Sequence, residues 1–482
     1  MYVLLSKNSY GAVRVKEMIV MTDRPSPAHP LRWRILGFLG VAQLMLILDV
    51  TVVAIALPHI ETDLDLSRQA VTWTISAYTL TFGGLMLLGG RLADLIGAKR
   101  VVLAGLLVFT AASLVTGLAD DGGLLLGGRV AQGLGAALLS PSALSLVVSL
   151  FDGDERNKAL GVWSALGGGG AALGVLVGGA LTAGPGWPWV FYVNVPIGLV
   201  IIAVLARMLP HQTVAAPRPR LDVLGALLVT ASSGALIYAF IRAGDDGWLT
   251  SATGWLILLA AIGYTAFVVR QRTARSPMMD VSLLVRRPVA TGTFLILMAT
   301  ALMIAVFFLG TFYFQHAKDY GALRTGLLFL PVALATMAGA NLTGRTIAKA
   351  GARPLAVAGL LTAAVGMALP ALVLNPVTAV IGTAIAGAGT GAMFVVASAT
   401  ALGQVAPHES GIASGIVSTF HEFGASIGAA VISSVAAASV TGDTLDGFTD
   451  GFVLAAITAT VAAAASAALT PPRPRKPLHA PN

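Results

Sequence analysis

The turn Gly89-Gly-Arg-Leu-Ala-Asp-Leu-Ile-Gly-Ala-Lys-Arg100 joins two apolar runs, each of which is long enough to cross a lipid bilayer. Four of its side chains carry charge: Arg91, Asp94, Lys99 and Arg100. Unpaired charges are costly in hydrocarbon, so the turn is expected to lie in water at a membrane surface. A shortened copy recurs at Gly344-Arg345 and Gly351-Ala-Arg353, and its two glycines lie 254 positions after Gly90 and Gly97. The repeat predicts a duplicated membrane protein.

The composition excludes an ordinary soluble protein. Of the 482 residues, 56% are hydrophobic and 11% are charged, whereas soluble globular proteins carry about 25% charged residues. The chain has no cysteine, which excludes disulfides and thiolate metal sites. Its first 30 residues are basic and contain three prolines, so no cleavable signal peptide is predicted, and Met1, Met18 or Met21 is the true start.

Apolar runs of about 20 residues predict transmembrane helices, because an isolated run in lipid must satisfy its backbone hydrogen bonds internally. The chain contains fourteen such runs, at approximately 34–57, 71–90, 99–119, 122–148, 160–183, 190–208, 221–241, 252–270, 288–314, 324–346, 353–374, 376–402, 411–438 and 449–470. We therefore expect an all-α polytopic membrane protein with fourteen transmembrane helices.

The basic residues set the expected orientation, because cytoplasmic loops are enriched in lysine and arginine. With both termini in the cytoplasm, the tails and the loops after even-numbered spans hold 25 of the 30 basic residues, while the opposite loops are acidic. The net charge of +8 is then a signal of topology, and no nucleic-acid partner is expected. The predicted location is the plasma (inner) membrane, with the lipid bilayer as a partner.

The repeated turn follows the second and the tenth span, so its two copies lie on the same side of the membrane. This predicts parallel halves related by an axis along the membrane normal. Eight spans rather than six separate the copies, which places two extra helices between two six-helix bundles. The expected domains are a cytoplasmic tail (1–33), an N-terminal bundle (34–210), a linker with the extra helices (211–272), a C-terminal bundle (273–470) and a second cytoplasmic tail (471–482).

Three charged side chains fall well inside predicted spans: Asp49, Arg129 and Glu422. At about 1.5 Å per helical residue, Asp49 and Arg129 lie about 13 Å and about 10 Å below the same surface, so they can interact. An acid that alternately meets water and an arginine can bind and release a proton. A static ion pair is the alternative, less favoured because intramembrane charges are usually functional. For Glu422 and its neighbour His421, proton exchange and a helix–helix hydrogen bond are equally good interpretations.

Four glycines remove the side chains from one face of span 5: Gly170, Gly174, Gly178 and Gly179. Small residues let a neighbouring helix approach closely, and such a smooth seam can also slide or rock. Trp187 and Trp189 are interpreted as part of an interfacial aromatic belt. The aromatic run at the outer end of span 9 is interpreted in the same way, in preference to a drug-stacking wall: Phe307, Phe308, Phe312, Tyr313 and Phe314.

Two segments match motifs of soluble enzymes, but both lie inside predicted spans. Gly424-Ala-Ser-Ile-Gly428 matches the hydrolase pattern GxSxG without a preceding strand, and Gly387-Ala-Gly-Thr-Gly391 resembles a dinucleotide loop. No Walker A sequence occurs, so direct ATP drive is unsupported. We expect no catalytic residues, no cofactor and no metal, and hence no enzyme.

Taken together, residues 34–470 resemble the major facilitator superfamily, and specifically its fourteen-span drug:proton antiporters. Four residues depart from the usual motifs: Ala54 replaces an asparagine, Leu95 a basic residue, Val175 a proline and Pro188 an arginine. The similar segments are the cytoplasmic loop motif (Gly90–Arg100), the first-span motif (Leu48–Pro58), the fourth-span motif (Arg129–Gly135), the antiporter motif (the span-5 glycines) and a group signature (Trp187–Gly198).

The resemblance implies roles for the residues singled out above. Asp49, Arg129 and Glu422 would serve proton coupling, with Asp49 carrying the proton and Arg129 tuning its release. The span-5 glycines would allow close helix motion. Closure of the cytoplasmic side would depend on a gating motif made of Gly90, Asp94, Gly97, Lys99 and Arg100.

The expected function is that of a secondary active transporter that exports small amphipathic compounds, such as drugs or antibiotics, in exchange for protons by alternating access. Its partners would be a small-molecule substrate and protons, and the chain would act as a monomer. One alternative is a proton-coupled importer or uniporter of a small solute on the same fold, and the substitution at Val175 bears on that question of direction. The other alternative is a membrane enzyme or sensor that transports nothing.

Overall fold

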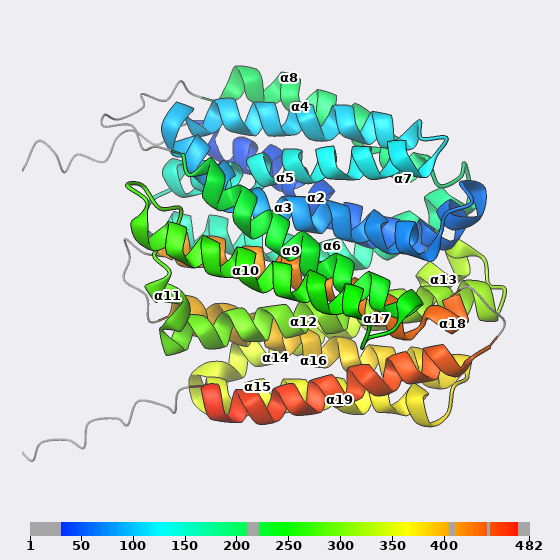
Figure 1. Cartoon of the computed structure of the whole chain (residues 1–482). Helices are drawn as coiled ribbons and strands as arrows, with labels where there is room; N and C mark the ends of the chain where they lie inside the picture. The colour runs from blue at the N-terminus through cyan, green and yellow to red at the C-terminus, as the bar shows by residue number, and fades with distance from the viewer. Residues whose placement is uncertain (1–29, 210–220, 404–409, 441–443, 471–482) are drawn as a thin grey trace, which may run out of the picture.

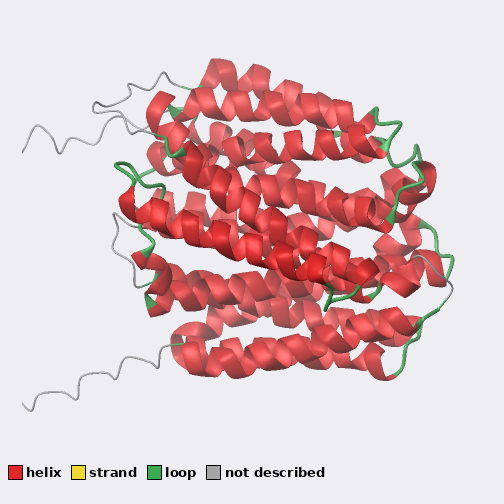
Figure 2. Cartoon of the chain, in the orientation of Figure 1, coloured by secondary structure: helices red, strands yellow, loops and turns green. Residues whose placement is uncertain are grey.

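A computed structural model describes residues 30–209, 221–403, 410–440 and 444–470. Within these residues the chain folds into helices joined by short loops and contains no strand (Figure 2). Most of the predicted N-terminal tail, the linker residues 210–220 and the whole of the predicted C-terminal tail lie outside the described residues.

The first bundle contains six spans, the last of which is divided between two helices. Its helices are α2 (Arg32–Asp63), α3 (Arg68–Ile96), α4 (Ala98–Gly117), α5 (Gly122–Leu150), α6 (Gly153–Ala183), α7 (Trp189–Tyr192) and α8 (Asn194–Met208). Two further spans then form a hairpin, which lies at the front of the molecule between the two bundles in Figure 1. They are α9 (Val223–Asp246) and α10 (Ser251–Thr273).

The second bundle also contains six spans, three of them preceded or followed by a short helix. Its helices are α11 (Ser282–Val285), α12 (Arg287–Phe312) with a π-helical end (Tyr313–Ala317), α13 (Ala322–Leu328), α14 (Leu330–Ala350), α15 (Ala352–Leu372), α16 (Pro376–Leu402), α17 (Ser410–Val435), α18 (Ala437–Val440) and α19 (Asp446–Leu469).

Thirteen of the described helices, with their short continuations, are long and apolar enough to cross a membrane. The fourteenth span is α6, which is 31 residues long and whose described apolar part is Leu173–Ala183. The predicted fold class, an all-α membrane protein with two six-helix bundles and two extra helices, is therefore confirmed.

Side-chain caps and turn glycines determine where several spans begin and end. Asp121 caps α5 and Asn375 caps α16, each by accepting hydrogen bonds from free backbone N–H groups of the first turn. The chain turns at Gly97 between α3 and α4 with φ of 94°, and at Gly351 between α14 and α15 with φ of 91°. Only glycine adopts such a left-handed backbone without strain. One glycine of each repeated pair is thus the turn residue itself, whereas Gly90 and Gly344 lie inside α3 and α14.

The two bundles meet along two seams. On one side of the molecule α3 packs on α17, and on the other side α6 packs on α13 and α14. Helix α9 packs against both α3 and α17, and α10 packs on α9. The hairpin therefore lies over the seam between α3 and α17.

The bundles are joined most closely at one end. We call the end at which α2 begins and α19 stops the inner end, and the opposite end the outer end. At the outer end the apolar core is continuous between the bundles, because residues 52–60 of α2 pack with the outer half of α12. Towards the inner end, α14 is exposed around most of its circumference, at positions that include Asn341, Leu342, Gly344 and Arg345. The molecule is thus closed at its outer end.

The predicted aromatic belt at the outer end of span 9 is wrong. The five aromatic side chains between Phe307 and Phe314 are at most 2% exposed. They are buried because α12 packs on α16, α17 and α19 and also on α2, so it lies in the interior and not at the lipid. Trp187 is also buried and donates a hydrogen bond to Asp63 at 2.8 Å, whereas Trp189 is 48% exposed, as a belt residue should be.

Candidate functional site

The predicted gating motif lies at the inner end, around the turn between α3 and α4. The Asp94 side chain is 58% exposed, and a guanidinium nitrogen of Arg91 in the same turn lies 4.0 Å from its carboxylate. Lys99 donates to the carbonyl oxygen of Leu209 at 2.6 Å, which ties the start of α4 to the end of α8. Arg100 is exposed. Within the described residues, Asp94 makes no ion pair with the second bundle.

Asp49 of α2 and Arg129 of α5 form a buried ion pair inside the first bundle. Guanidinium Nη1 of Arg129 donates to carboxylate Oδ2 of Asp49, and the two side chains are at most 1% exposed. Removing one member of such a pair leaves an uncompensated buried charge, at a cost of about 3–5 kcal/mol. The structure thus brings together two of the three intramembrane charges that the sequence singles out.

Gln132 and Ser113 extend this pair into a hydrogen-bond network. Nε2 of Gln132 donates to Oδ1 of Asp49 at 3.0 Å and to the Ser113 hydroxyl at 2.9 Å. Oε1 of Gln132 accepts from Arg129 at 3.0 Å, and Nε of Arg129 donates to the carbonyl oxygen of Thr74 at 2.8 Å. Both carboxylate oxygens of Asp49, and Nε and Nη1 of Arg129, therefore have partners.

Tyr78 of α3 covers the guanidinium from one side. The centroid of its ring lies 4.4 Å from Cζ of Arg129, within the range of about 6 Å for a cation–π contact. Its hydroxyl donates to the carbonyl oxygen of Leu46 at 3.3 Å, which fixes the ring. If Asp49 loses its charge, the guanidinium therefore keeps a carbonyl, an amide and an aromatic partner. The arrangement can hold Arg129 in place while the charge of the carboxyl changes.

Glu422 lies apart from this network, on α17 at the seam with α3. The residue is 8% exposed, and an added Cβ at Gly83 of α3 would lie 2.7 Å from Cβ of Glu422. Within the described residues, no arginine, lysine or histidine forms an ion pair with it. Its neighbour His421 points into the second bundle, where Nδ1 lies 3.0 Å from the Thr300 hydroxyl and the ring lies 5.6 Å from that of Phe394. The described residues contain no group of three His, Asp or Glu that could hold a metal ion.

The glycines of span 5 face two different neighbours. An added Cβ at Gly170, Gly174 or Gly178 would lie within 2.9 Å of atoms of α2. An added Cβ at Gly179 would lie 2.8 Å from the carbonyl oxygen of Ala322 in α13. Three of these glycines therefore let α2 pack closely on α6, and the fourth lets the two bundles meet.

Hydroxyl groups pair across the outer half of the α3/α17 seam. The hydroxyl oxygens of Thr72 and Ser433 are 2.5 Å apart, and so are those of Thr79 and Ser426. Glu422 follows one turn further toward the inner end of α17. Neutral hydrogen bonds thus join α3 and α17 at these two levels of the seam.

Among the residues of the polar networks that sequence reasoning missed, two carried a signal in the sequence. Gln132 is three residues after Arg129, a spacing at which two side chains on a helix are neighbours, and this spacing is the signal that could have found it. Arg68 is a basic residue in an outer loop that is otherwise acidic. In the structure it is buried, with 5% of its surface exposed. A lone basic residue in an acidic loop is the signal in that case.

Comparisons with known proteins agree with this architecture. The family profile described as Major Facilitator Superfamily matches residues 39–429 and 332–482. Two solved structures share the fold at low sequence identity. A crystal structure of a mutant of the peptide transporter POT in complex with alafosfalin aligns with a TM-score of 0.66 and 18% identity over 94% of this chain and 97% of that chain. An auto-inhibited POT family peptide transporter aligns with a TM-score of 0.62 and 16% identity over 93% and 99%.

Relatives of known name are closer in sequence. The puromycin resistance protein pur8 of Streptomyces alboniger is 39% identical over 408 residues, which cover 83% of this chain and 80% of the relative. The cephamycin export protein CmcT of Amycolatopsis lactamdurans is 35% identical over 399 residues, covering 80% and 81%. A lincomycin resistance protein of Streptomyces lincolnensis is 36% identical over 337 residues, covering 68% of each chain. The chain therefore belongs to the major facilitator superfamily, among its drug-efflux transporters, and is a multi-pass membrane transporter and not an enzyme.

Proposed function

We propose that this transporter exports small amphipathic compounds, antibiotics among them, in exchange for protons, and that it works by alternating access. Relatives named for puromycin, cephamycin and lincomycin support the substrate class. The observation that carries the proton coupling is the buried pair of Asp49 and Arg129, because paired charges inside a membrane bundle are typical of proton and ion pathways. The closed outer end supports an inward-facing state, which receives substrate from the cytoplasm.

In this proposal, the proton and the guanidinium of Arg129 compete for the carboxylate of Asp49. When the outer side opens and water reaches Asp49, a proton binds and the ion pair is lost. Arg129 stays in place because the Thr74 carbonyl, Gln132 and Tyr78 still hold it. On return to the inward-facing state the pair forms again, and the proton leaves on the cytoplasmic side. The dry, fully paired network then corresponds to the deprotonated carrier.

Glu422 serves as a second acid or as the site that attracts cationic substrates. It faces the other bundle across the α3/α17 seam and has no cation partner within the described residues. A lone carboxylate in a site of low dielectric is costly, so either a proton or a positively charged substrate is favoured there. Neutralisation of Glu422 by a proton or by a cationic substrate would therefore link the binding of either one to the opening of the α3/α17 seam.

The gating motif acts at the inner end when the transporter faces outward. Asp94 is exposed in the described state and becomes available to the second bundle once the inner ends approach. Gly97 keeps the turn compact, and Gly90 lies inside α3, where it faces Pro141 of α5. Lys99 and Arg100 hold the start of α4 at the membrane surface. The span-5 glycines let the helices stay close during the motion. Both termini lie in the cytoplasm of a plasma-membrane monomer, which contains both bundles in one chain.

The test is transport by the purified protein in proteoliposomes under an imposed pH gradient, with puromycin as the first compound. Asp49→Asn is expected to lower gradient-driven transport by at least about tenfold, because an amide cannot bind the proton. Asp120→Asn, in an exposed outer loop, is the matched control and keeps the normal rate. If Asp49→Asn transports at the normal rate and still depends on the gradient, the proton role is wrong.

The direction of the gradient separates export from the alternatives. An antiporter accumulates substrate on the acidic side of the membrane, whereas a proton-coupled importer accumulates it on the alkaline side. A uniporter equilibrates the substrate whatever the gradient.

A further inference from the structure

Arg68 is a buried cation in an unfavourable place. It is the first residue of α3, directly after the cap Ser67, and its side chain is 4% exposed. The N-terminus of a helix carries a partial positive charge, so a cation there is repelled by the helix as well as being desolvated. Such a residue is stable only where other elements supply several acceptors.

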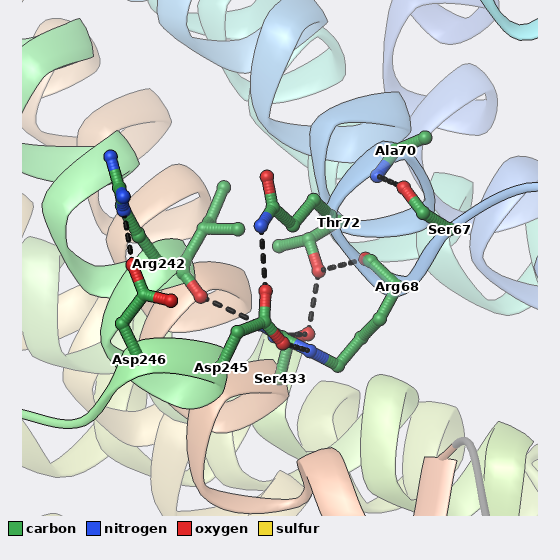
Figure 3. Close-up of polar contacts among 10 residues, drawn as sticks. Ser67, Arg68, Ala70, Thr72, Arg242, Asp245, Asp246 and Ser433 are labelled. Atoms are coloured by element: carbon green, nitrogen blue, oxygen red, sulfur yellow. Dashed lines mark hydrogen bonds and ion pairs between the residues drawn. The ribbon is translucent and has the colours of Figure 1, made fainter.

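Two other helices supply these acceptors (Figure 3). The carboxylate of Asp245 in α9 accepts from Nε of Arg68 at 3.0 Å and from Nη2 at 2.7 Å. The Ile241 carbonyl of α9 accepts from Nη2 at 2.7 Å, and the Ser433 hydroxyl of α17 accepts from Nη1 at 3.1 Å. Gln69 adds a 2.6 Å hydrogen bond to the other oxygen of Asp245. One guanidinium therefore joins the first bundle, the extra hairpin and the second bundle.

The hairpin is attached to the second bundle at both of its ends. At the outer end, an added Cβ at Gly244 would lie 2.7 Å from Cα of Ser434 in α17. At the inner end, Phe267 of α10 is buried with Leu283 of α11 and Ile416 of α17. Asp245 thus lies on a helix that packs on both bundles, and Arg68 reaches the second bundle directly through Ser433 of α17. A carrier built from two six-helix bundles alone would lack this carboxylate.

On the inner side of Arg68, the α3/α17 seam is held by neutral hydrogen bonds, which stabilise it less than the charged contacts of the arginine do. The Thr72–Ser433 and Thr79–Ser426 pairs can exchange their hydrogen bonds for water at a small net cost, whereas hydrogen bonds to charged groups are stronger. Within the described residues, the charged contacts of Arg68 are therefore the strongest polar contacts of the α3/α17 seam.

We propose that Arg68 and Asp245 form the outer latch of the transporter, and that the two extra helices serve in this gate by supplying the carboxylate. The inference rests on the alternating access of the proposed function. In the inward-facing state the latch is closed, as in Figure 3. The outer side opens only when Arg68 leaves Asp245 and Ser433.

The test measures how often the outer end opens. Because the chain has no cysteine, Ser76→Cys gives a single reporter thiol. Ser76 is fully buried and lies about 12 Å from Arg68 along α3. A membrane-impermeant methanethiosulfonate is added to the outer face of cells. Arg68→Gln and Asp245→Asn are each expected to raise the initial labelling rate about tenfold, and Arg68→Lys is expected to raise it less.

The matched control is Arg242→Gln, which removes the arginine of the neighbouring, exposed Arg242–Asp246 pair within α9. It leaves both bundles untouched and should not change labelling. The double variant Arg68→Gln/Asp245→Asn should label no faster than the faster single variant, because the two residues act as one unit. A size-exclusion profile checks folding, and if Arg68→Gln does not fold, Asp245→Asn decides alone.

Labelling that changes less than twofold in both latch variants would overturn the proposal, as would an equal rise in Arg242→Gln. The measurement uses neither substrate nor a pH gradient. A carrier that fails the test of proton coupling at Asp49 can therefore still show a functional latch, and a normal proton response can accompany a failed latch.

Discussion

Gln132 contacts the carboxylate of Asp49, the guanidinium of Arg129 and the hydroxyl of Ser113 with a single amide. A plain ion pair needs no such third partner. The amide keeps Asp49 and Arg129 in position, so that the ion pair forms again after the proton has been bound and released. At the scale of the residue, this makes Gln132 a positioning group for proton exchange.

Replacing Gln132 by alanine should slow transport. The change leaves one oxygen of Asp49 and one N–H of Arg129 without their partner, and hydrogen bonds to charged groups contribute about 1.5–3 kcal/mol. We expect Gln132→Ala to lower the maximal rate in proteoliposomes about tenfold, with KM for the substrate within about twofold. Ser142→Ala, which removes a buried hydroxyl of the same helix that has no hydrogen-bond partner, is the control. A raised KM at an unchanged maximal rate would instead mean that Gln132 contacts the substrate.

Gly178 gives a prediction about packing. An added Cβ at this position would lie 2.9 Å from Cα of Val52 and 3.0 Å from its carbonyl oxygen, and these backbone atoms cannot rotate away. Gly178→Ala should therefore push α6 from α2 and cost about 1–3 kcal/mol, seen as a lower midpoint of thermal aggregation in detergent. Gly127→Ala, where an added Cβ meets nothing within 4 Å, should leave the midpoint unchanged or raise it. Equal effects at both glycines would contradict this account of the span-5 motif.

The residues of the charge network were only partly predictable from the sequence. Asp49 and Arg129 stand out because charges are rare in apolar runs, and their similar depth predicts that they meet. Tyr78, Thr74 and Ser113 carry no such signal, because ordinary polar and aromatic residues occur throughout the spans. Which of them face the pair depends on the rotation and packing of α3 and α4, and one sequence does not contain that information.

At the scale of the element, Asp222 shows how the inner end of the hairpin is stabilised. It precedes α9, outside the membrane-spanning segments, and its side chain is 2% exposed. Arg270 donates to its carboxylate at 3.0 Å, Gln271 at 2.7 Å and the Gly225 N–H at 3.1 Å. Burial raises the pKa of Asp222, but the hydrogen bonds outweigh this effect and hold the pKa below its usual value.

This direction of the pKa shift sets the pH dependence of the hairpin. A carboxyl whose pKa is depressed by folding stabilises the fold above the unfolded-state pKa of about 3.9, and this stabilisation is lost as the pH falls through the folded-state pKa. We expect Asp222→Asn to lower the thermal midpoint at pH 7 by a few degrees, and the difference from the parent to shrink below about pH 4. The measurement is the midpoint in detergent between pH 3 and pH 8. A difference that persists unchanged at pH 3 would show that packing, not charge, stabilises this end.

The seam between α3 and α17 gives a second prediction at this scale. The Thr72 and Ser433 hydroxyls are 2.5 Å apart, so cysteines at both positions can form a disulfide in a chain that has no other thiol. Oxidised Thr72→Cys/Ser433→Cys should transport at least about tenfold more slowly, and a reductant should restore the rate. The control is Ser232→Cys/Gly263→Cys within the hairpin, where an added Cβ at Gly263 would lie 3.2 Å from Cβ of Ser232. Normal transport by the oxidised seam variant would mean that the two helices do not part.

The spans themselves were predictable, because lipid demands long apolar helices. Their ends and faces were not. The first span is predicted to end near residue 57, yet α2 continues through Pro58 to Asp63. The aromatic run of span 9 is predicted to face the lipid interface, but α12 is surrounded by helices of both bundles. Composition indicates that a segment spans the membrane, but not which neighbours surround it.

At the scale of the whole molecule, the offset between the repeated turns predicts two bundles with two helices between them. The repeat cannot show where those two helices pack. In the structure they lie over the α3/α17 seam, where Leu80 of α3 and Phe423 of α17 are buried with Ile237 and Ile241 of α9. The hairpin breaks the twofold symmetry that a duplicated chain would otherwise have.

This asymmetry determines from which side an amphipathic substrate can enter the transporter. Amphipathic molecules concentrate in the bilayer leaflet before they bind to a transporter. The α9–α10 hairpin covers the α3/α17 seam and therefore blocks lateral entry from the bilayer on that side. In the part of the chain that the structure describes, no other helix covers the opposite flank, between α6 and α14, and Leu342 of α14 is 66% exposed. Photoreactive substrate analogues should therefore label α14 and α6, and an excess of unmodified substrate should reduce this labelling. Helices α9 and α10 should be labelled only at background level. Substrate would then enter the transporter laterally from the bilayer leaflet, and only between α6 and α14.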